Sequence, residues 1–225
     1  MSRSTAQGER PATPARTAPL ARQSLLRADR DVVETIDAAL MRASRLAGPN
    51  LACRPGCSEC CIGPFPINRL DGSRLRQGLE ELRDKDPQRA AAIAERARLT
   101  VGQFAKDFPG DRTTGRLSGQ EADEDRFFEA HSAVPCPVLD PTTQTCDLYA
   151  HRPVSCRSYG PPLRFGGQDL PPCRLCFQGA AQETIEACRV EPDPSGLERA
   201  VLKRLERGDG DAGETVIAYA VIDER

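Results

Sequence analysis

The feature that most constrains this chain is the segment CRPGCSECC at residues 53–61, which places four cysteines within nine positions. Cys57 and Cys60 form a C-x2-C pair, whose thiolates are spaced to bind one tetrahedral ion from a single turn of chain. Cys53 precedes this pair and Cys61 follows it directly. A segment so dense in thiols can form a disulfide knot, a redox centre or a metal site.

The disulfide interpretation fits the rest of the chain poorly. Its 225 residues include ten cysteines, enough for five disulfides, but these crowd into a few short blocks. The N-terminal sequence MSRSTAQGERPATPARTAPL lacks the apolar core of a secretory signal. We therefore expect a cytoplasmic protein, in which thiols stay reduced and bind metal or do chemistry. A disulfide between Cys60 and Cys61 would also be strained.

Composition argues against two classes of partner. The chain is 39% hydrophobic and 28% charged, which suits a globular protein, and its net charge is −2. This charge gives no basis for binding nucleic acid or an anionic membrane. No stretch approaches the roughly 18 apolar residues of a membrane span. We expect a metal ion as partner, no nucleic acid and no membrane, while a protein partner or substrate stays open.

The adjacent pair Cys60 and Cys61 bears on the kind of metal. Backbone geometry turns neighbouring side chains apart, so these two thiolates do not easily bind the same ion. If both are ligands, they serve different metal atoms. The pair therefore tilts the choice from zinc, the commoner structural ion at four thiolates, toward an iron–sulfur cluster.

A second cysteine-rich region lies within residues 134–176, which are rich in Pro and Gly and poor in apolar periodicity. Cys136, Cys146 and Cys156 follow one another with nine residues between each pair. Neither they nor the first block close a good tetrahedral site alone, so we expect the two blocks to converge. The thiols of Cys57, Cys60 and Cys61 should then lie close to those of Cys146 and Cys156.

A second C-x2-C pair, Cys173 and Cys176, raises the redox alternative again. A thioredoxin-like site needs this motif at a helix N-terminus after a strand. Here it follows Pro171-Pro172 with no convincing strand before it, so a metal site is the better interpretation. The predicted metal ligands are Cys53, Cys57, Cys60, Cys61, Cys136, Cys146, Cys156, Cys173 and Cys176.

Other side chains near these blocks have predicted roles as well. Cys188, near Ile185 in a possible helix, is interpreted as a small buried apolar residue that stands apart from the metal or at most at its edge. Arginines beside the cysteines can offset thiolate charge or donate hydrogen bonds to sulfur. These arginines are Arg54, Arg152, Arg157 and Arg174. Arg157, directly after Cys156, is the one we predict to contact the cofactor.

Helical patterns surround the cysteine blocks. Apolar stripes predict a helix over residues 24–47 and further helices between the blocks. Residues 1–23 are expected to be a disordered tail, since prolines interrupt any helix there. The predicted fold is therefore mostly α, a single domain over residues 24–225, with helices around metal-binding loops at about 53–61 and 134–176.

Capping signals predict where several helices begin. Asp86-Pro87 combines an N-cap with Pro at the first helical position. Ser118 with Glu121, and Ser195 with Glu198, have the spacing of capping boxes. The C-terminal segment TVIAYAVID at 215–223 fits either a short buried helix or a strand.

Together the two blocks resemble a known family. The pattern C-x3-C-x2-C-C, followed by C-P-x-L-D…C-x-L-Y-x-x-R-P-x-x-C-R-x-Y, is similar to that of YkgJ-type cysteine-cluster proteins, which are described as zinc- or iron-chelating. The similarity covers roughly residues 53–61 and 134–176, and Cys173 resembles a cysteine that often follows in the family. It implies a metal site at these cysteines and adds Tyr159, beside Arg157, as a cofactor-binding position.

Three functions remain compatible with this pattern. The leading one is a metal-binding protein that holds an iron–sulfur cluster or zinc through clustered cysteines. The second is a metal-dependent protein-modifying enzyme, because flagellin lysine methylases share the motif; those chains are longer, and no separate catalytic segment here matches them. The third is an interaction protein stapled by structural zinc, since a Pro- and Gly-rich region lacks a core of its own.

Overall fold

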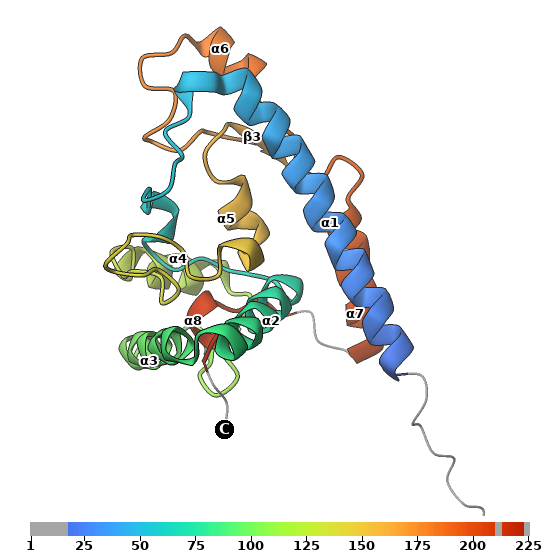
Figure 1. The fold of residues 1–225 in the computed structure, drawn as a ribbon, viewed down its shortest axis with the longest axis vertical. Coiled ribbons are helices and arrows are strands. Elements are labelled where there is room, and N and C mark those ends of the chain that lie inside the picture. The colour runs from blue at the N-terminus through green and yellow to red at the C-terminus, as the bar shows by residue number, and fades with distance from the viewer. Residues whose placement is uncertain (1–17, 210–212, 223–225) are drawn as a thin grey trace, which may run out of the picture.

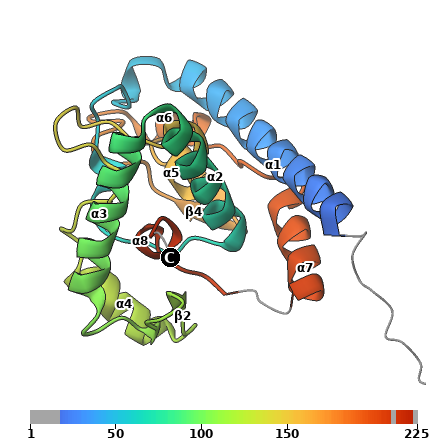
Figure 2. The same cartoon turned by 60° about the horizontal axis from the view of Figure 1, so that its bottom comes forward.

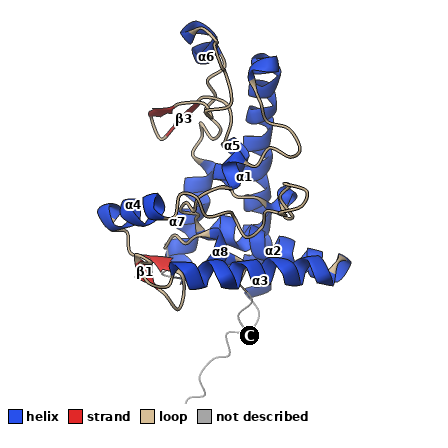
Figure 3. Cartoon of the chain, turned by 90° about the vertical axis from the view of Figure 1, so that its left-hand side faces the viewer, coloured by secondary structure: helices blue, strands red, loops and turns tan. Residues whose placement is uncertain are grey.

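The computed structural model describes residues 18–209 and 213–222 of the chain. This part contains eight α-helices and two short antiparallel hairpins (Figure 1, Figure 3). The prediction of a mostly α single domain is therefore confirmed. Most of the predicted tail, residues 1–17, lies outside the described residues.

One layer of the fold is built on the long helix α1 (Ala18–Ala47), which begins six residues before the expected start at residue 24. It packs against α5 (Val154–Ser158) and α7 (Leu197–Asp209). Val32 and Ile36 lie one turn apart and are fully buried in this contact, as the apolar stripe predicts. Helix α1 thus holds α5, which contains Cys156, against its side.

The other layer consists of α2 (Arg69–Lys85), α3 (Pro87–Phe104) and α8 (Ile217–Ala220). Helix α8 contacts both α2 and α3 and lies between them (Figure 2). Ile93 and Ile217 belong to the apolar cluster that joins the three helices. Within the described part of the segment TVIAYAVID, residues Ile217–Ala220 therefore form a short buried helix and not a strand.

Asp86 caps α3 as predicted. Its side chain accepts a hydrogen bond from the backbone N–H of Arg89 at 3.0 Å, and Pro87 occupies the first helical position. Both features satisfy or avoid the unpaired N–H groups of a helix start. This local signal is independent of tertiary context, which is why it could be found in the sequence.

The two predicted capping boxes are wrong. The N-cap of α4 (Glu121–Ala130) is Gln120, and Ser118 instead accepts a hydrogen bond from the N–H of Gln120. At α7, two backbone N–H groups donate to Asp193 at 2.9 Å, so Ser195 does not cap the helix. A carboxylate accepts N–H groups at a helix start more strongly than a hydroxyl does, because its charge faces the positive end of the helix dipole.

The other short elements include two hairpins and one helix. Strands β1 (Gly110–Asp111) and β2 (Arg116–Leu117) form one hairpin, and β3 (Leu163–Phe165) and β4 (Gln168–Leu170) form another. Helix α6 (Gln182–Ala187) follows the second C-x2-C pair. In the part of the chain that the structure describes, no helix has both the length and the apolar character needed to cross a membrane.

The first cysteine block connects the two layers. After α1 the chain makes a short 3-10 turn, η1 (Gly48–Asn50), and then runs back along the molecule to α2 (Figure 1). At the start of this run, the N–H of Phe177 donates to the carbonyl of Asn50 at 2.7 Å. At its end, the N–H of Cys136 donates to the carbonyl of Cys61 at 2.7 Å. The run from Asn50 to Cys61 therefore contacts the later chain at two places, Phe177 at its start and Cys136 at its end.

Candidate metal centre

Five cysteines gather at the C-terminal end of the first block, which is its lower end in Figure 1. They lie next to the layer formed by helices α2, α3 and α8. The Cys60 thiol interacts electrostatically with those of Cys136, Cys146 and Cys156, and it hydrogen-bonds that of Cys61. Cys61 in turn interacts with Cys136 and Cys146. We call these five residues the five-thiol group.

The thiols of this group differ in acidity. A hydrogen bond from the Cys61 thiol, assisted by the charge of Arg152, lowers the pKa of Cys60 to about 7 against the opposing effect of burial. The same hydrogen bond, with burial, raises the pKa of Cys61. Burial raises the pKa of Cys136 to about 12 and that of Cys156 well above its ordinary value. Buried thiols become stable thiolates when a metal cation neutralises them.

Arg152 is the cation that faces the five-thiol group. Its charge lowers the pKa of Cys60 and opposes the burial that raises the pKa of Cys146. Its guanidinium stacks on the Tyr149 ring, 3.7 Å from the centroid. Its buried Nε has no hydrogen-bond partner among the described residues. A buried donor without an acceptor is costly, and an anionic sulfur beside Cys60 would satisfy it.

Two arginines of α3 hold the loop that carries Cys146. Arg89 and Arg96 pair with the carboxylate of Asp147 at 2.6 Å and 2.8 Å, and the Asp147 side chain is only 1% exposed. Arg96 also donates to the carbonyl of Pro137 at 2.7 Å. Both ends of the loop from Cys136 to Cys146 are therefore fixed to a helix.

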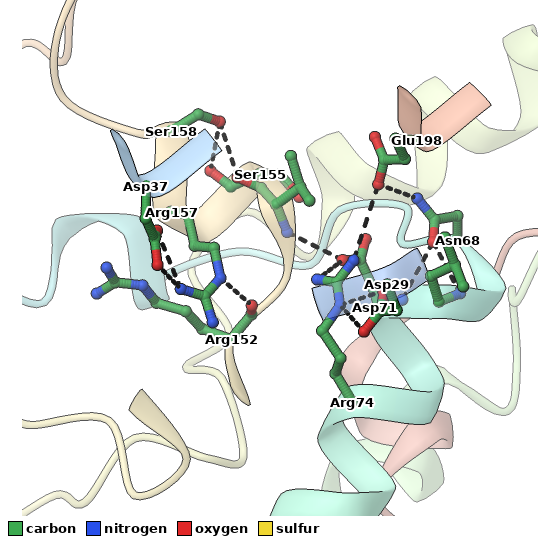
Figure 4. Close-up of polar contacts among 12 residues, drawn as sticks. Asp29, Asp37, Asn68, Asp71, Arg74, Arg152, Ser155, Arg157, Ser158 and Glu198 are labelled. Carbon is green, nitrogen blue, oxygen red and sulfur yellow. Dashed lines mark hydrogen bonds and ion pairs between the residues drawn. The ribbon is translucent and has the colours of Figure 1, made fainter. Parts of the chain in front are cut away.

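A buried ionic network fixes α5, which carries Cys156. The N–H of Val154 donates to Asp71 at 2.9 Å, and Arg74 bridges Asp71 at 2.7 Å and Asp29 of α1 at 2.9 Å (Figure 4). Burial raises the pKa of Asp71, while the charge of Arg74 opposes that shift. The network joins α1, α2 and α5 at the N-terminus of the short helix.

Arg157, predicted to contact the cofactor, points instead toward α1. Its guanidinium pairs with Asp37 of α1 at 2.8 Å and donates to the carbonyl of Arg152 at 3.1 Å (Figure 4). Consecutive residues on a helix point about 100° apart, so Arg157 faces α1 when Cys156 faces the thiols. Arg152, outside the helix, has the position expected of Arg157.

Four further cysteines gather at the N-terminal end of the first block, near the end of α1, which is the upper end of the molecule in Figure 1. The sulfur of Cys176 accepts hydrogen bonds from the thiol of Cys173 and from the N–H of Ala52 at 3.4 Å. The Cys53 thiol lies beside it and donates to the carbonyl of Tyr159 at 3.9 Å. Cys57 interacts electrostatically with Cys53. Burial raises the pKa of Cys53 to about 12 and also raises that of Cys173. We call these four cysteines the four-thiol group.

Tyr159 and Gly160 adjoin the four-thiol group. The Tyr159 hydroxyl donates to the Cys173 thiol, and burial raises the pKa of Tyr159. The N–H of Cys173 donates to the carbonyl of Gly160 at 3.0 Å. Gly160 has φ of +138°, and a Cβ there would lie 2.9 Å from the sulfur of Cys53. The approach of these two segments therefore requires glycine.

The two blocks meet, but the grouping differs from the expected one at Cys57. Cys60 interacts with Cys146 and Cys156 as expected, whereas Cys57 interacts with Cys53. The 3-10 turn η2 (Glu59–Cys61) redirects the chain between the two positions. The C-x2-C spacing alone does not show that this turn directs Cys57 and Cys60 to different places.

Cys188 is buried, with 4% of its surface exposed, at the end of α6. It does not stand apart from every other cysteine, because it belongs to the same apolar cluster as Cys173, Cys176 and Phe177. Its environment is that of a small apolar side chain.

The donor chemistry fits a metal, although the thiols do not converge on one point. As placed, no three His, Cys, Asp or Glu side chains among the described residues are arranged to hold a metal ion. Each group nevertheless consists of thiols alone and offers at least the four ligands that zinc or an iron–sulfur cluster takes. Rotation about one side-chain torsion, χ1, is enough to turn each thiol toward a shared metal. The buried Nε of Arg152, which lacks an acceptor among the described residues, also fits an anionic centre at this place.

A family model described as "CxxCxxCC: Putative zinc- or iron-chelating domain" matches residues 52–174, more than half of the chain. The matched segment includes the whole five-thiol group but ends before Cys176 and Cys188. No curated protein and no solved structure matches the chain.

Proposed function

The chain belongs to the CxxCxxCC family of zinc- or iron-chelating domains, and from this premise we propose that its five-thiol group binds an iron–sulfur cluster. The observation that carries the proposal is the adjacent pair, because Cys61 interacts with Cys136 and Cys146, as Cys60 does. Both neighbours belong to one group of thiols.

A cluster accommodates such a pair more readily than a single ion does. A structural zinc ion takes four ligands around one centre. An iron–sulfur cluster offers several iron atoms, so thiolates from adjacent residues can reach different ones. Cys136, Cys146 and Cys156 supply the remaining thiols from three separate backbone segments, which suits an extended cofactor.

Arg152 supports the same assignment. A cluster with thiolate ligands carries negative charge, and hydrogen bonds to its sulfur atoms tune its reduction potential. The Arg152 guanidinium lies beside Cys60 and Cys146 with one buried donor unpaired. We assign it the role of donating to sulfur at the centre.

The cavity beside this group favours metal binding over modification of a protein substrate at this place. It is lined by Cys136, Phe104 and Val216, and its volume is about 20 Å³. This is room for about one water molecule. A lysine side chain of a substrate protein would not fit there.

Anaerobic purification followed by iron and acid-labile sulfide analysis tests the proposal. We expect a brown protein whose iron content and visible absorption fall when Cys60→Ser or Cys156→Ser is introduced. Cys188→Ala is the control and should leave both unchanged. A colourless protein that holds only zinc would contradict the iron–sulfur assignment.

A further inference from the structure

We infer that the four-thiol group is a second, separate metal site that binds zinc in a closed tetrahedral arrangement. The inference rests on the proposed metal binding of the chain but not on which metal the five-thiol group holds. It takes Cys53, Cys57, Cys173 and Cys176 as the ligands.

The first argument is the convergence of donors on one sulfur. The Cys176 sulfur accepts hydrogen bonds from the N–H of Ala52 at 3.4 Å and from the thiol of Cys173, and the Cys53 thiol lies beside it. A backbone N–H that donates to sulfur is a common outer contact of metal-bound cysteine. Cys57, which interacts electrostatically with Cys53, is the fourth ligand of the proposed site.

The second argument is the backbone on which the thiols stand. The N–H of Cys176 donates to the carbonyl of Cys173 at 2.8 Å, and that of Cys57 donates to the carbonyl of Arg54 at 2.9 Å. Each bond closes a turn between two cysteines or immediately beside them. Two thiol-bearing turns that face each other are the usual construction of a structural zinc site.

The third argument is a strained residue directly after the second C-x2-C pair. Phe177 has φ of +55°, a left-handed conformation that bulky residues rarely adopt. It is buried, and its N–H donates to the carbonyl of Asn50 at 2.7 Å. Strain of this kind persists where the surroundings fix the chain, and here it turns Cys176 toward the end of α1.

The apolar core around Phe177 is too small to hold this strained backbone by itself. The apolar cluster at the upper end consists of Ala47, Phe177 and three cysteines, with only a few partly buried neighbours. Two of those cysteines, Cys173 and Cys176, are proposed ligands. A zinc ion would therefore supply folding energy that this core lacks. Four thiolates without an open position suit zinc at a structural site.

Glu59 and Arg174 form an ion pair between the two cysteine-bearing segments. Glu59 lies on η2 between Cys57 and Cys60, and its carboxylate pairs with Arg174 within the second C-x2-C pair at 2.9 Å. This contact fixes the turn that sends Cys57 to one group and Cys60 to the other.

Metal counting on single-cysteine variants of the full chain tests the inference. Zinc and iron are measured in anaerobically purified wild type, Cys176→Ser and Cys146→Ser. We expect Cys176→Ser to lose about one zinc per chain and keep its iron, and Cys146→Ser to lose iron and keep that zinc. X-ray absorption at the zinc edge should give four sulfur neighbours at about 2.3 Å.

The outcomes separate this inference from the iron–sulfur proposal. Two zinc ions in the wild type, of which each variant loses one, would contradict the cluster and support the second site. Loss of iron in Cys176→Ser to the same extent as in Cys146→Ser would overturn the second site. So would a wild type without zinc. Cys53→Ser, at the exposed ligand, repeats the test if Cys176→Ser does not fold.

Discussion

The two thiol groups differ most in what holds them. The five-thiol group is supported by helices: α3 grips the loop through Asp147, and Asp71 of α2 fixes the start of α5. The four-thiol group is supported by turns, a two-stranded hairpin and a small apolar cluster. Its Cys53 is exposed, whereas its Cys173 and Cys176 are buried. The cysteines themselves are the main shared core at the upper end.

Under the proposed assignment, this difference gives the metal unequal importance for folding at the two places. Where ion pairs and a helical core already fix the ligands, a metal adds its own chemistry to an existing frame. Where the ligands make up much of the core, binding and folding are one process. The upper end should therefore depend on metal more than the lower end does.

Removal of all metal should have the largest effect on the molecule. A strong chelator is expected to reduce amide protection by orders of magnitude in residues 48–57 and 159–190. Residues 137–148 and α3 should lose far less, since Arg89 and Arg96 still hold the loop. Hydrogen exchange with mass spectrometry measures this. Equal loss of protection in both regions would refute the comparison.

The buried network beneath α5 comes next. Arg74→Ala leaves the carboxylates of Asp71 and Asp29 without their buried cation, and we expect a loss of about 3–5 kcal/mol in the free energy of unfolding. Arg164→Ala removes a guanidinium from an exposed pair with Asp169 and should change stability little. Denaturant unfolding of metal-loaded protein measures both. Equal effects would show that burial of the network does not matter.

Asp147→Asn tests the grip of α3 on the five-thiol group. It removes the charge that pairs with Arg89 and Arg96, and the expected cost is about 1–3 kcal/mol because the carboxylate is buried. The variant should also lower iron content without lowering zinc. Asp169→Asn, in an exposed pair near the upper end, serves as the control. A loss of zinc instead of iron in Asp147→Asn would contradict the assignment of this loop.

Gly160→Ala should have the smallest effect and confine it to the upper end. The added Cβ would press on the sulfur of Cys53, so we expect a cost of about 1–2 kcal/mol from backbone strain and displacement. Zinc should then dissociate faster to a competing chelator. Gly167→Ala, also at positive φ but facing open space, provides the control for strain alone. Equal zinc dissociation rates in the two variants would show that Gly160 does not shape the site.

Much of the fold follows from local sequence signals. Asp86-Pro87 marks the start of α3, and apolar stripes mark α1 and the helices between the cysteine blocks. These signals are found because each depends only on residues within a turn or two. The density of cysteines likewise indicates a metal site from the sequence alone.

The remainder depends on contacts between distant segments. Spacing gives no sign that η2 separates Cys57 from Cys60, or that Asp193 caps α7 in place of Ser195. Arg157 pairs with Asp37 of α1, and Arg152 faces Cys60 instead, because of the direction of one short helix against α1. Such choices are made by tertiary packing, which motif spacing does not record.

Residue-resolved alkylation tests the central claim, the division into two independent sets of thiols, most directly. Metal-loaded protein is titrated with chelator, and each cysteine is scored for reaction with iodoacetamide by mass spectrometry. We predict two cohorts: Cys53, Cys57, Cys173 and Cys176 become reactive together, and Cys60, Cys61, Cys136, Cys146 and Cys156 become reactive together at a different chelator concentration. Release of Cys57 with Cys60 and Cys61, or of all nine cysteines in one step, would contradict the account.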